Sequence, residues 1–291
     1  RVIAALKEAE TRPENIVDRT FTRLLYGDHP YGLQGSGEIE TVSRIQRQDL
    51  LDFYRGRYLA GSAVVAIMGD LSRAEAGAIA ESLTRGLPRG QQAAPLPPVP
   101  APRRETVQRI PHPATQAHIN MGYPGVSRND PDYFPLYVGN YILGGGGFVS
   151  RLNQQVREKR GLAYSVYSYF TPLQERGPFE IGLQTRKDQA GEALSIVKQT
   201  VQEFIARGPT ERELTAAKQN IIGGFPLRID SNRKIHEYLA LIGFYQLPLT
   251  YLDDFLRKVE RVTVADIKSA FSRRIKPDAM VTVIVGATET E

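Results

Sequence analysis

An internal repeat constrains the fold of this chain more than any other feature of its sequence. Residues 49–69 match residues 266–286 without a gap, at a constant offset of 217 positions. The matched pairs are Asp49 with Asp266, Leu50 with Ile267, Tyr54 with Phe271, Arg57 with Arg274 and Gly69 with Gly286, and upstream Ile39 with Leu256, Val42 with Val259 and Ile45 with Val262. Agreement at both polar and apolar positions indicates a duplicated unit rather than a chance likeness of two helix–strand pairs.

The two copies differ in what precedes the matching part. The second copy has about 100 residues there, roughly 104–220, whereas the first has almost none. Arg1 also begins a helix-forming segment with no Ser, Thr, Asp or Asn before it to cap the helix. We therefore expect the first copy to be truncated at its N-terminus by about 100 residues.

A proline-rich segment marks the boundary between the copies. Residues 92–102 contain five prolines in eleven residues, a composition typical of an extended, semi-rigid linker. We expect three parts: residues 1–91 as the C-terminal half of the first domain, residues 92–103 as the linker, and residues 104–291 as the second domain. Long runs of helices beside paired strands favour an α+β class, a duplicated two-layer domain with an antiparallel or mixed sheet covered by helices. The expected strands are 63–69, 105–110, 116–123, 164–170, 179–185 and 280–286.

Composition excludes several classes of protein. Lys and Arg exceed Asp and Glu by only 37 to 32 without forming a block, so nucleic-acid binding is not expected. The chain has no cysteine, which excludes disulfides, a thiol nucleophile and any cysteine metal site. No apolar run reaches the roughly 18–20 residues that span a bilayer. The compartment stays open between the bacterial periplasm and cytoplasm, with the periplasm slightly favoured.

A run of four glycines, Gly144, Gly145, Gly146 and Gly147, lies between two expected helices, 133–143 and one capped by Ser150. A glycine loop that opens a helix is typical of phosphate-binding sites. No Gly-Lys-Ser/Thr follows, however, and the third glycine of the dinucleotide fingerprint falls on Val149. Neither nucleotide motif is therefore supported.

Arg157 and Tyr164 flank a turn at Gly161, the first at the end of a helix and the second at the start of a strand. Such a turn can aim a guanidinium and a phenol at one point, where both donate hydrogen bonds to a substrate carbonyl or its oxyanion. The alternative is structural: an arginine that caps a helix C-terminus beside a half-buried strand tyrosine. Spacing alone does not separate the two.

The stretch 142–168, with Ser150-Arg151-Leu152 and the run 157–168, resembles the pitrilysin/insulinase-type zinc peptidases. That family includes the mitochondrial processing peptidases and bacterial processing-protease relatives, and the resemblance extends over essentially the whole chain. It implies that Arg157 and Tyr164 bind and polarise a peptide substrate. It also implies substrate handling by the loop Gly144, Gly145, Gly146 and Gly147, although a tight helix–helix connection explains these glycines equally well.

The sequence departs from the family's catalytic pattern. None of the four histidines, His29, His112, His118 and His236, lies in an H-x-x-E-H motif, so we assign no metal ligand to this chain. The resemblance implies a zinc site in missing N-terminal residues or in a partner subunit, with which this chain would form a homodimer or heterodimer. We expect the chain alone to be inactive. The alternative is a catalytically inert structural or interaction module of the same fold, as in respiratory-complex core subunits.

Overall fold

The chain is organised around a five-stranded mixed sheet. The computed structural model describes residues 1–90 and 94–286. The strands lie in the order β1-β5-β2-β4-β3; β1 and β5 run parallel and the other neighbours antiparallel. The predicted mixed sheet in an α+β fold is confirmed. The strands are β1 (Thr106–Ile110), β2 (Gln116–Pro124), β3 (Ala163–Phe170), β4 (Pro178–Arg186) and β5 (Val281–Val285).

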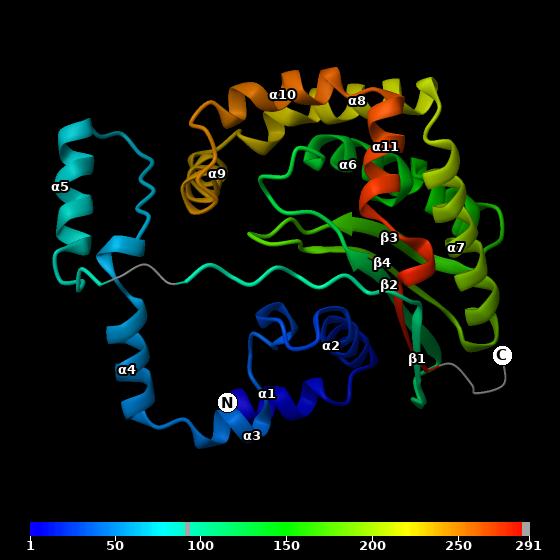
Figure 1. Cartoon of the computed structure of the whole chain (residues 1–291), viewed down its shortest axis with the longest axis horizontal. Coiled ribbons are helices and arrows are strands. Elements are labelled where there is room, and N and C mark those ends of the chain that lie inside the picture. Colours follow the sequence, from blue (N-terminus) through cyan, green and yellow to red (C-terminus); the bar gives the residue numbers. More distant parts are fainter. Residues whose placement is uncertain (91–93, 287–291) are drawn as a thin grey trace.

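Helices cover one face of the sheet (Figure 1). Apolar residues at helical spacing point from these helices toward the strands and form the main core, in which Leu136, Phe204 and Phe271 are fully buried. The helices are α6 (Tyr133–Asn140), α7 (Ala190–Arg207), α8 (Glu211–Gly224), α9 (Asn232–Phe244), α10 (Tyr251–Arg261) and α11 (Val264–Arg274). Sheet and helices together give the two-layer architecture expected for residues 104–291.

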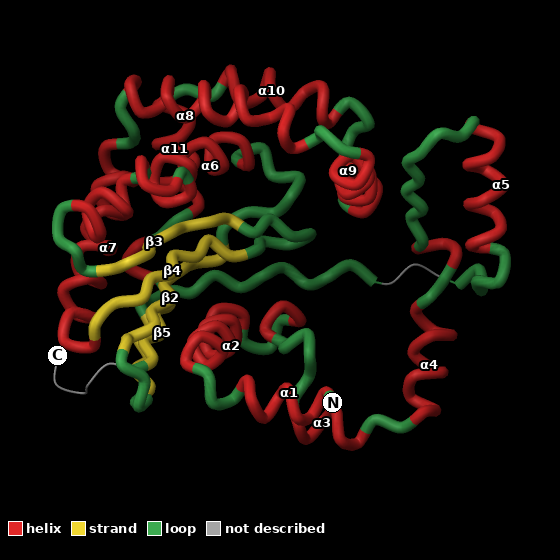
Figure 2. Tube along the Cα trace, turned by 180° about the vertical axis from the view of Figure 1, so that it is seen from behind, coloured by secondary structure: helices red, strands yellow, loops and turns green. Residues whose placement is uncertain are grey.

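The opposite face of the sheet is covered by a helix from the first part of the chain. Helix α2 (Pro13–Tyr26) follows α1 (Val2–Ala9) and lies across β2 and β5, as the rear view also shows (Figure 2). It buries Val17, Phe21 and Leu25 against the valines of β5. The sheet therefore joins the two parts of the chain, because each of its faces packs against a different part.

Residues 39–90 extend away from the sheet and bury none of their side chains (Figure 1). They contain α3 (Ile39–Arg44), α4 (Arg47–Arg57) and α5 (Arg73–Thr84). Large apolar side chains are exposed there, among them Leu50, Phe53 and Leu83. Beyond this arm, residues 94–105 run as an extended chain without helix or strand. Gln92 and Ala93 of the predicted linker lie outside the described residues.

The offset of 217 also appears in local structure. Helix α4 covers Arg47–Arg57 and α11 covers Val264–Arg274, and the short 3₁₀ turns that follow them, Ala60–Ser62 and Pro277–Ala279, keep the same offset. Equivalent aspartates cap the two helices: Asp49 accepts the backbone N–H of Gln46, and Asp266 that of Thr263, at 2.8 and 2.9 Å. Local sequence thus produces the same helix ends in two different surroundings.

The predicted buried strand 63–69 is wrong. This segment is irregular and mostly exposed, although its repeat counterpart forms β5 at the centre of the sheet. A strand needs neighbours for its backbone N–H and C=O groups, and no described strand lies beside these residues. They run past α9 instead, where the Ala66 carbonyl is 3.0 Å from Nε2 of His236.

We expect Phe21→Ala to lower the free energy of unfolding by about 3–5 kcal/mol, because the ring is 2% exposed between α2 and the sheet. Urea denaturation followed by circular dichroism measures the change. Leu33→Ala is the matched control, since Leu33 is 76% exposed and its truncation should change stability by less than about 0.5 kcal/mol. Equal midpoints for the two variants would contradict the packing of α2 on the sheet.

Candidate functional site

The glycine run lets the end of α6 approach strand β3. Residues Tyr141–Gly145 continue α6 as a single π-helical turn, an arrangement that often occurs at functional sites. A Cβ on Gly144 would lie 2.3 Å from the hydroxyl and 2.6 Å from the backbone nitrogen of Ser168. Gly147 has a φ of +64° and open space around it. The predicted loop therefore has a packing role at Gly144 and a turning role at Gly147; its substrate-handling role stays a prediction.

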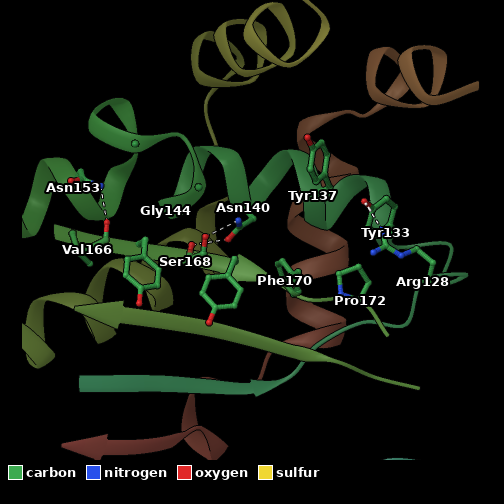
Figure 3. A pocket seen from close by; sticks show the side chains of 14 residues that line it. Arg128, Tyr133, Tyr137, Asn140, Gly144, Asn153, Val166, Ser168, Phe170 and Pro172 are labelled. Atoms are coloured by element: carbon green, nitrogen blue, oxygen red, sulfur yellow. Dashed lines mark hydrogen bonds between the residues drawn. The ribbon is translucent and has the colours of Figure 1, made fainter. Parts of the chain in front are cut away.

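Two asparagines bind the free edge of the sheet. Asn140, at the end of α6, donates to the Ser168 carbonyl at 3.0 Å and accepts from the Ser168 hydroxyl at 2.7 Å. Asn153 donates to the Val166 carbonyl at 2.8 Å (Figure 3). Because β3 is an edge strand, these carbonyls have no strand partner on that side. The two side-chain amides thereby supply hydrogen bonds to the edge carbonyls of β3 and hold the glycine turn against this strand.

Arg157 and Tyr164 meet across the turn at Gly161, as the sequence predicts. Gly161 has a φ of +62° and donates its N–H to the Arg157 carbonyl, which ends the helical segment. The Arg157 guanidinium lies 5.4 Å from the centre of the Tyr164 ring and 4.5 Å from that of Phe148. Tyr164 is 84% exposed. The two side chains thus lie together at the surface, with the guanidinium held between two aromatic rings.

Phe148 was not identified by sequence reasoning, although it directly follows the glycine run. Ser150 also differs from expectation, since its hydroxyl donates to the Gly147 carbonyl at 2.7 Å instead of accepting a helix N–H.

The neighbouring Arg151 is structural. It forms a two-pronged ion pair with Glu213, both contacts at 2.7 Å, and its guanidinium lies over the Phe204 ring. This pair fixes the segment that carries Arg157 to helix α8.

A groove of about 490 Å³ follows β3 from the glycine turn to the loop before α6. Gly144 and Asn153 line one end, while Arg128 and Pro172 line the other (Figure 3). Four tyrosines, from α6 and β3, line the wall between these ends: Tyr133, Tyr137, Tyr167 and Tyr169. The groove therefore runs from the glycine turn to the cation Arg128; Arg157 and Tyr164 are not among the described residues that line it.

A buried carboxylate on the opposite face of the sheet was also missed. Asn120 of β2 donates to Glu180 of β4 at 2.8 Å and to Asp18 of α2 at 2.7 Å. Glu180 is 8% exposed, and its pKa is raised to about 7. Burial is the largest cause and the nearby Asp18 adds to it, while a hydrogen bond from Tyr169 opposes the change. Two polar residues within otherwise apolar strands were the signal in the sequence.

The histidines do not fit a zinc site. In the described part of the chain, no group of three His, Cys, Asp or Glu side chains is placed to hold a metal ion. Three of the histidines instead direct Nε2 at backbone carbonyls: His29 at Pro97, His112 at Thr11 and His236 at Ala66. Across the same residues, no helix combines the length and hydropathy that a bilayer crossing requires.

Comparison with known proteins settles the family. The sequence profile described as the peptidase M16 inactive domain matches residues 44–221, which include the glycine run, Arg157 and Tyr164. The chain belongs to the peptidase M16 inactive-domain family. The M16 chain is 29% identical to an uncharacterized zinc protease of Streptomyces coelicolor, with 92% of this chain aligned. It spans 60% of that relative's length.

Solved structures agree with this assignment. A crystal structure of a peptidase M16 inactive domain from Pseudomonas fluorescens is 39% identical, with a TM-score of 0.94 over 99% of the M16 chain and 68% of its own length. The fold alone also matches a chain of complex III from Candida albicans, at 15% identity and a TM-score of 0.84 over 98% of the M16 chain and 69% of the other. The predicted family resemblance is confirmed.

We expect Gly144→Ala to lower the free energy of unfolding by about 1–3 kcal/mol, because its Cβ meets the Ser168 backbone nitrogen, which cannot move without disturbing β3. Gly147→Asn is the matched control in the same loop, since asparagine tolerates positive φ and nothing lies near the new side chain. Thermal unfolding compares the variants. A Gly144→Ala protein as stable as wild type would contradict the close approach.

Glu180 makes stability depend on pH. Its carboxyl has a higher pKa in the folded chain than in the unfolded one, so folding is disfavoured as the pH rises from about 4.5 to about 7. We expect Glu180→Gln to raise the free energy of unfolding by about 1–3 kcal/mol at pH 8 and to change it little at pH 4. Urea denaturation at both pH values measures this, with the exposed Glu81→Gln as control. A gain that is equal at both pH values would rule out the titration of Glu180 as its cause.

Proposed function

We propose that this chain is the zinc-free part of an M16 peptidase and supplies Arg157 and Tyr164 to bind and polarise the scissile carbonyl of a peptide. The observation that carries the proposal is the meeting of these two side chains at an exposed surface, where the Arg157 guanidinium lies 5.4 Å from the centre of the Tyr164 ring. An inward-facing structural pair would bury the tyrosine, whereas Tyr164 is 84% exposed. The guanidinium and phenol N–H and O–H groups suit the oxyanion that a carbonyl becomes during peptide hydrolysis.

The zinc centre of such an enzyme would lie outside these 291 residues, either in another part of a longer polypeptide or in a partner subunit. The described residues contain no set of ligands for it, and the chain spans only part of its relatives. Within the proposal, Phe148 and Tyr164 hold the Arg157 guanidinium between their rings, and η5 (Asn153–Glu158) is fixed to β3 through Asn153. The donors are therefore oriented before substrate arrives, which is what electrostatic stabilisation requires.

Arg157→Ala and Tyr164→Phe should each lower kcat/KM of the complete enzyme by roughly 10²-fold, the scale of one lost transition-state donor. The measurement is hydrolysis of a quenched fluorescent peptide by the full-length protein or the assembled subunits. Arg160→Ala is the matched control, because Arg160 lies three residues from Arg157 and, among the described residues, its side chain bonds to Gln155 alone. If Arg157→Ala and Tyr164→Phe both kept full activity, the pair would have a structural role only.

A second candidate function is a catalytically inert structural or interaction module. The exposed apolar side chains of residues 30–90 favour it, since such a surface requires a covering partner. The fold match to a complex III chain also supports it. Metal analysis separates the two functions: a full-length protein or assembly that binds no zinc, cleaves no peptide and still forms a stable complex would support the inert module.

A further inference from the structure

Arg128 lies at the far end of the groove from Arg157, in the loop between β2 and α6. Its backbone N–H donates to the Leu173 carbonyl at 2.8 Å, which ties the loop to the segment after β3. The side chain is held in place by tyrosines. Its Nη1 donates to the Tyr133 hydroxyl at 3.3 Å, and the guanidinium lies 5.4 Å from the centre of the Tyr133 ring. The guanidinium also lies 5.1 Å from the Tyr245 ring centre. Arg128 is therefore positioned by neutral groups.

No described carboxylate pairs with Arg128. Other arginines in this region are neutralised: Arg273 and Arg274 bind Asp132, and Arg274 also binds Asp130. Both nearby aspartates are thus engaged elsewhere. The Nε–H of Arg128 is buried and, among the described residues, has no hydrogen-bond partner. Buried donors are almost always satisfied in folded proteins, so the guanidinium of Arg128 keeps hydrogen-bonding capacity that the described residues do not use.

The groove contains a single charge. Of the described residues that line it, Arg128 alone is ionised, and the others are tyrosines, asparagines, glycines and small or apolar residues. Figure 3 shows the Arg128 side chain turned toward Tyr133 at one end of this wall. A lone positive charge in a neutral groove favours an anionic group, and a guanidinium matches the two oxygens of a carboxylate.

The groove follows β3 from Val166 to Phe170, a stretch of strand that suits a short extended peptide. Tyr164 and Phe170 lie near the two ends of β3, and the strand between them spans about 20 Å at roughly 3.3 Å per residue. The β3 carbonyls of Val166 and Ser168 are occupied by Asn153 and Asn140, so a bound segment would contact the tyrosine wall rather than add to the sheet there. An extended segment of about six residues would reach from Tyr164 to Arg128.

We propose that Arg128 is an anion-binding subsite that takes a carboxylate of a peptide lying in the groove along β3. The inference rests on the proposed function, since the peptide is the one whose reacting carbonyl lies at Arg157 and Tyr164. It adds a substrate preference: peptides with a carboxylate about six residues from the reacting bond bind more tightly than neutral ones. The carboxylate is a C-terminus or an acidic side chain, and the two sources share the same recognition by Arg128.

Binding to the full chain, without hydrolysis, tests the proposal. The probe is an N-dansylated hexapeptide of alternating alanine and leucine that ends in a free carboxylate, in an amide, or in a glutamate followed by an amide. Fluorescence anisotropy measures Kd at fixed ionic strength. We expect at least one carboxylate peptide to bind about 10-fold more tightly than the neutral amide. If the peptide with the free C-terminus binds more tightly, the subsite takes a C-terminal carboxylate; if the glutamate amide binds more tightly, it takes an acidic side chain. Equal Kd values for all three peptides would overturn the proposal.

Arg128→Met should remove the preference for carboxylate, so that the carboxylate peptides and the neutral amide bind this variant with equal Kd. Arg160→Met, a surface arginine outside the groove, is the matched control and should keep the preference. A preference that survives in Arg128→Met would overturn the assignment. If that variant does not fold, the wild-type chain still decides: acetate should compete with the carboxylate peptide more strongly than chloride at equal ionic strength, and equal competition would count against the site.

The two proposals fail separately. A carboxylate preference that depends on Arg128, together with full hydrolysis by Arg157→Ala in the complete enzyme, would contradict the proposed function and leave the anion site standing as a binding site. Loss of hydrolysis in Arg157→Ala without any carboxylate preference would contradict only the role of Arg128.

Discussion

The candidate site depends on how closely the end of helix α6 approaches the edge strand β3. Gly144 permits the contact because no Cβ fits against Ser168, and Asn140 and Asn153 secure it by binding two edge carbonyls. An edge strand with free backbone groups would otherwise be open to pairing with another chain. The contact sets the wall of the groove and, through Asn153, the position of the segment that carries Arg157.

The sheet has a second role as the surface on which the two parts of the chain meet. Helix α2, from the part before the proline-rich linker, packs on the face opposite the other helices through Phe21 and its neighbours. Asp18, Asn120 and Glu180 form a buried polar contact within this interface. Apolar packing supplies stability here, whereas a buried carboxylate whose pKa is raised by burial reduces stability at neutral pH. Retention of such a group makes the contact between α2 and the sheet sensitive to pH.

The repeat illustrates the limit of local information. The helices at an offset of 217 begin and end at equivalent residues in both copies, because capping by Asp49 and Asp266 acts within one turn. The strand that follows forms only in the second copy, where β1 and β2 lie on either side of β5. Residues 63–69 have a similar apolar pattern but no strand beside them among the described residues, so the pattern alone does not produce a strand.

The sequence by itself predicted the five strands of residues 104–286, the α+β class and a turn at Gly161 that can bring Arg157 and Tyr164 together; it left open whether this pair is functional. These follow from periodicity, capping and turn residues, which act over a few positions, and from the family resemblance around residues 142–168. Only the tertiary structure decided which face of the sheet α2 covers, that Phe148 and Asn153 support Arg157, and that Arg128 lies at the end of the groove with no carboxylate partner among the described residues. Those contacts join residues from different elements, and their energies depend on packing and on the charges nearby, neither of which is written in any short stretch of the chain.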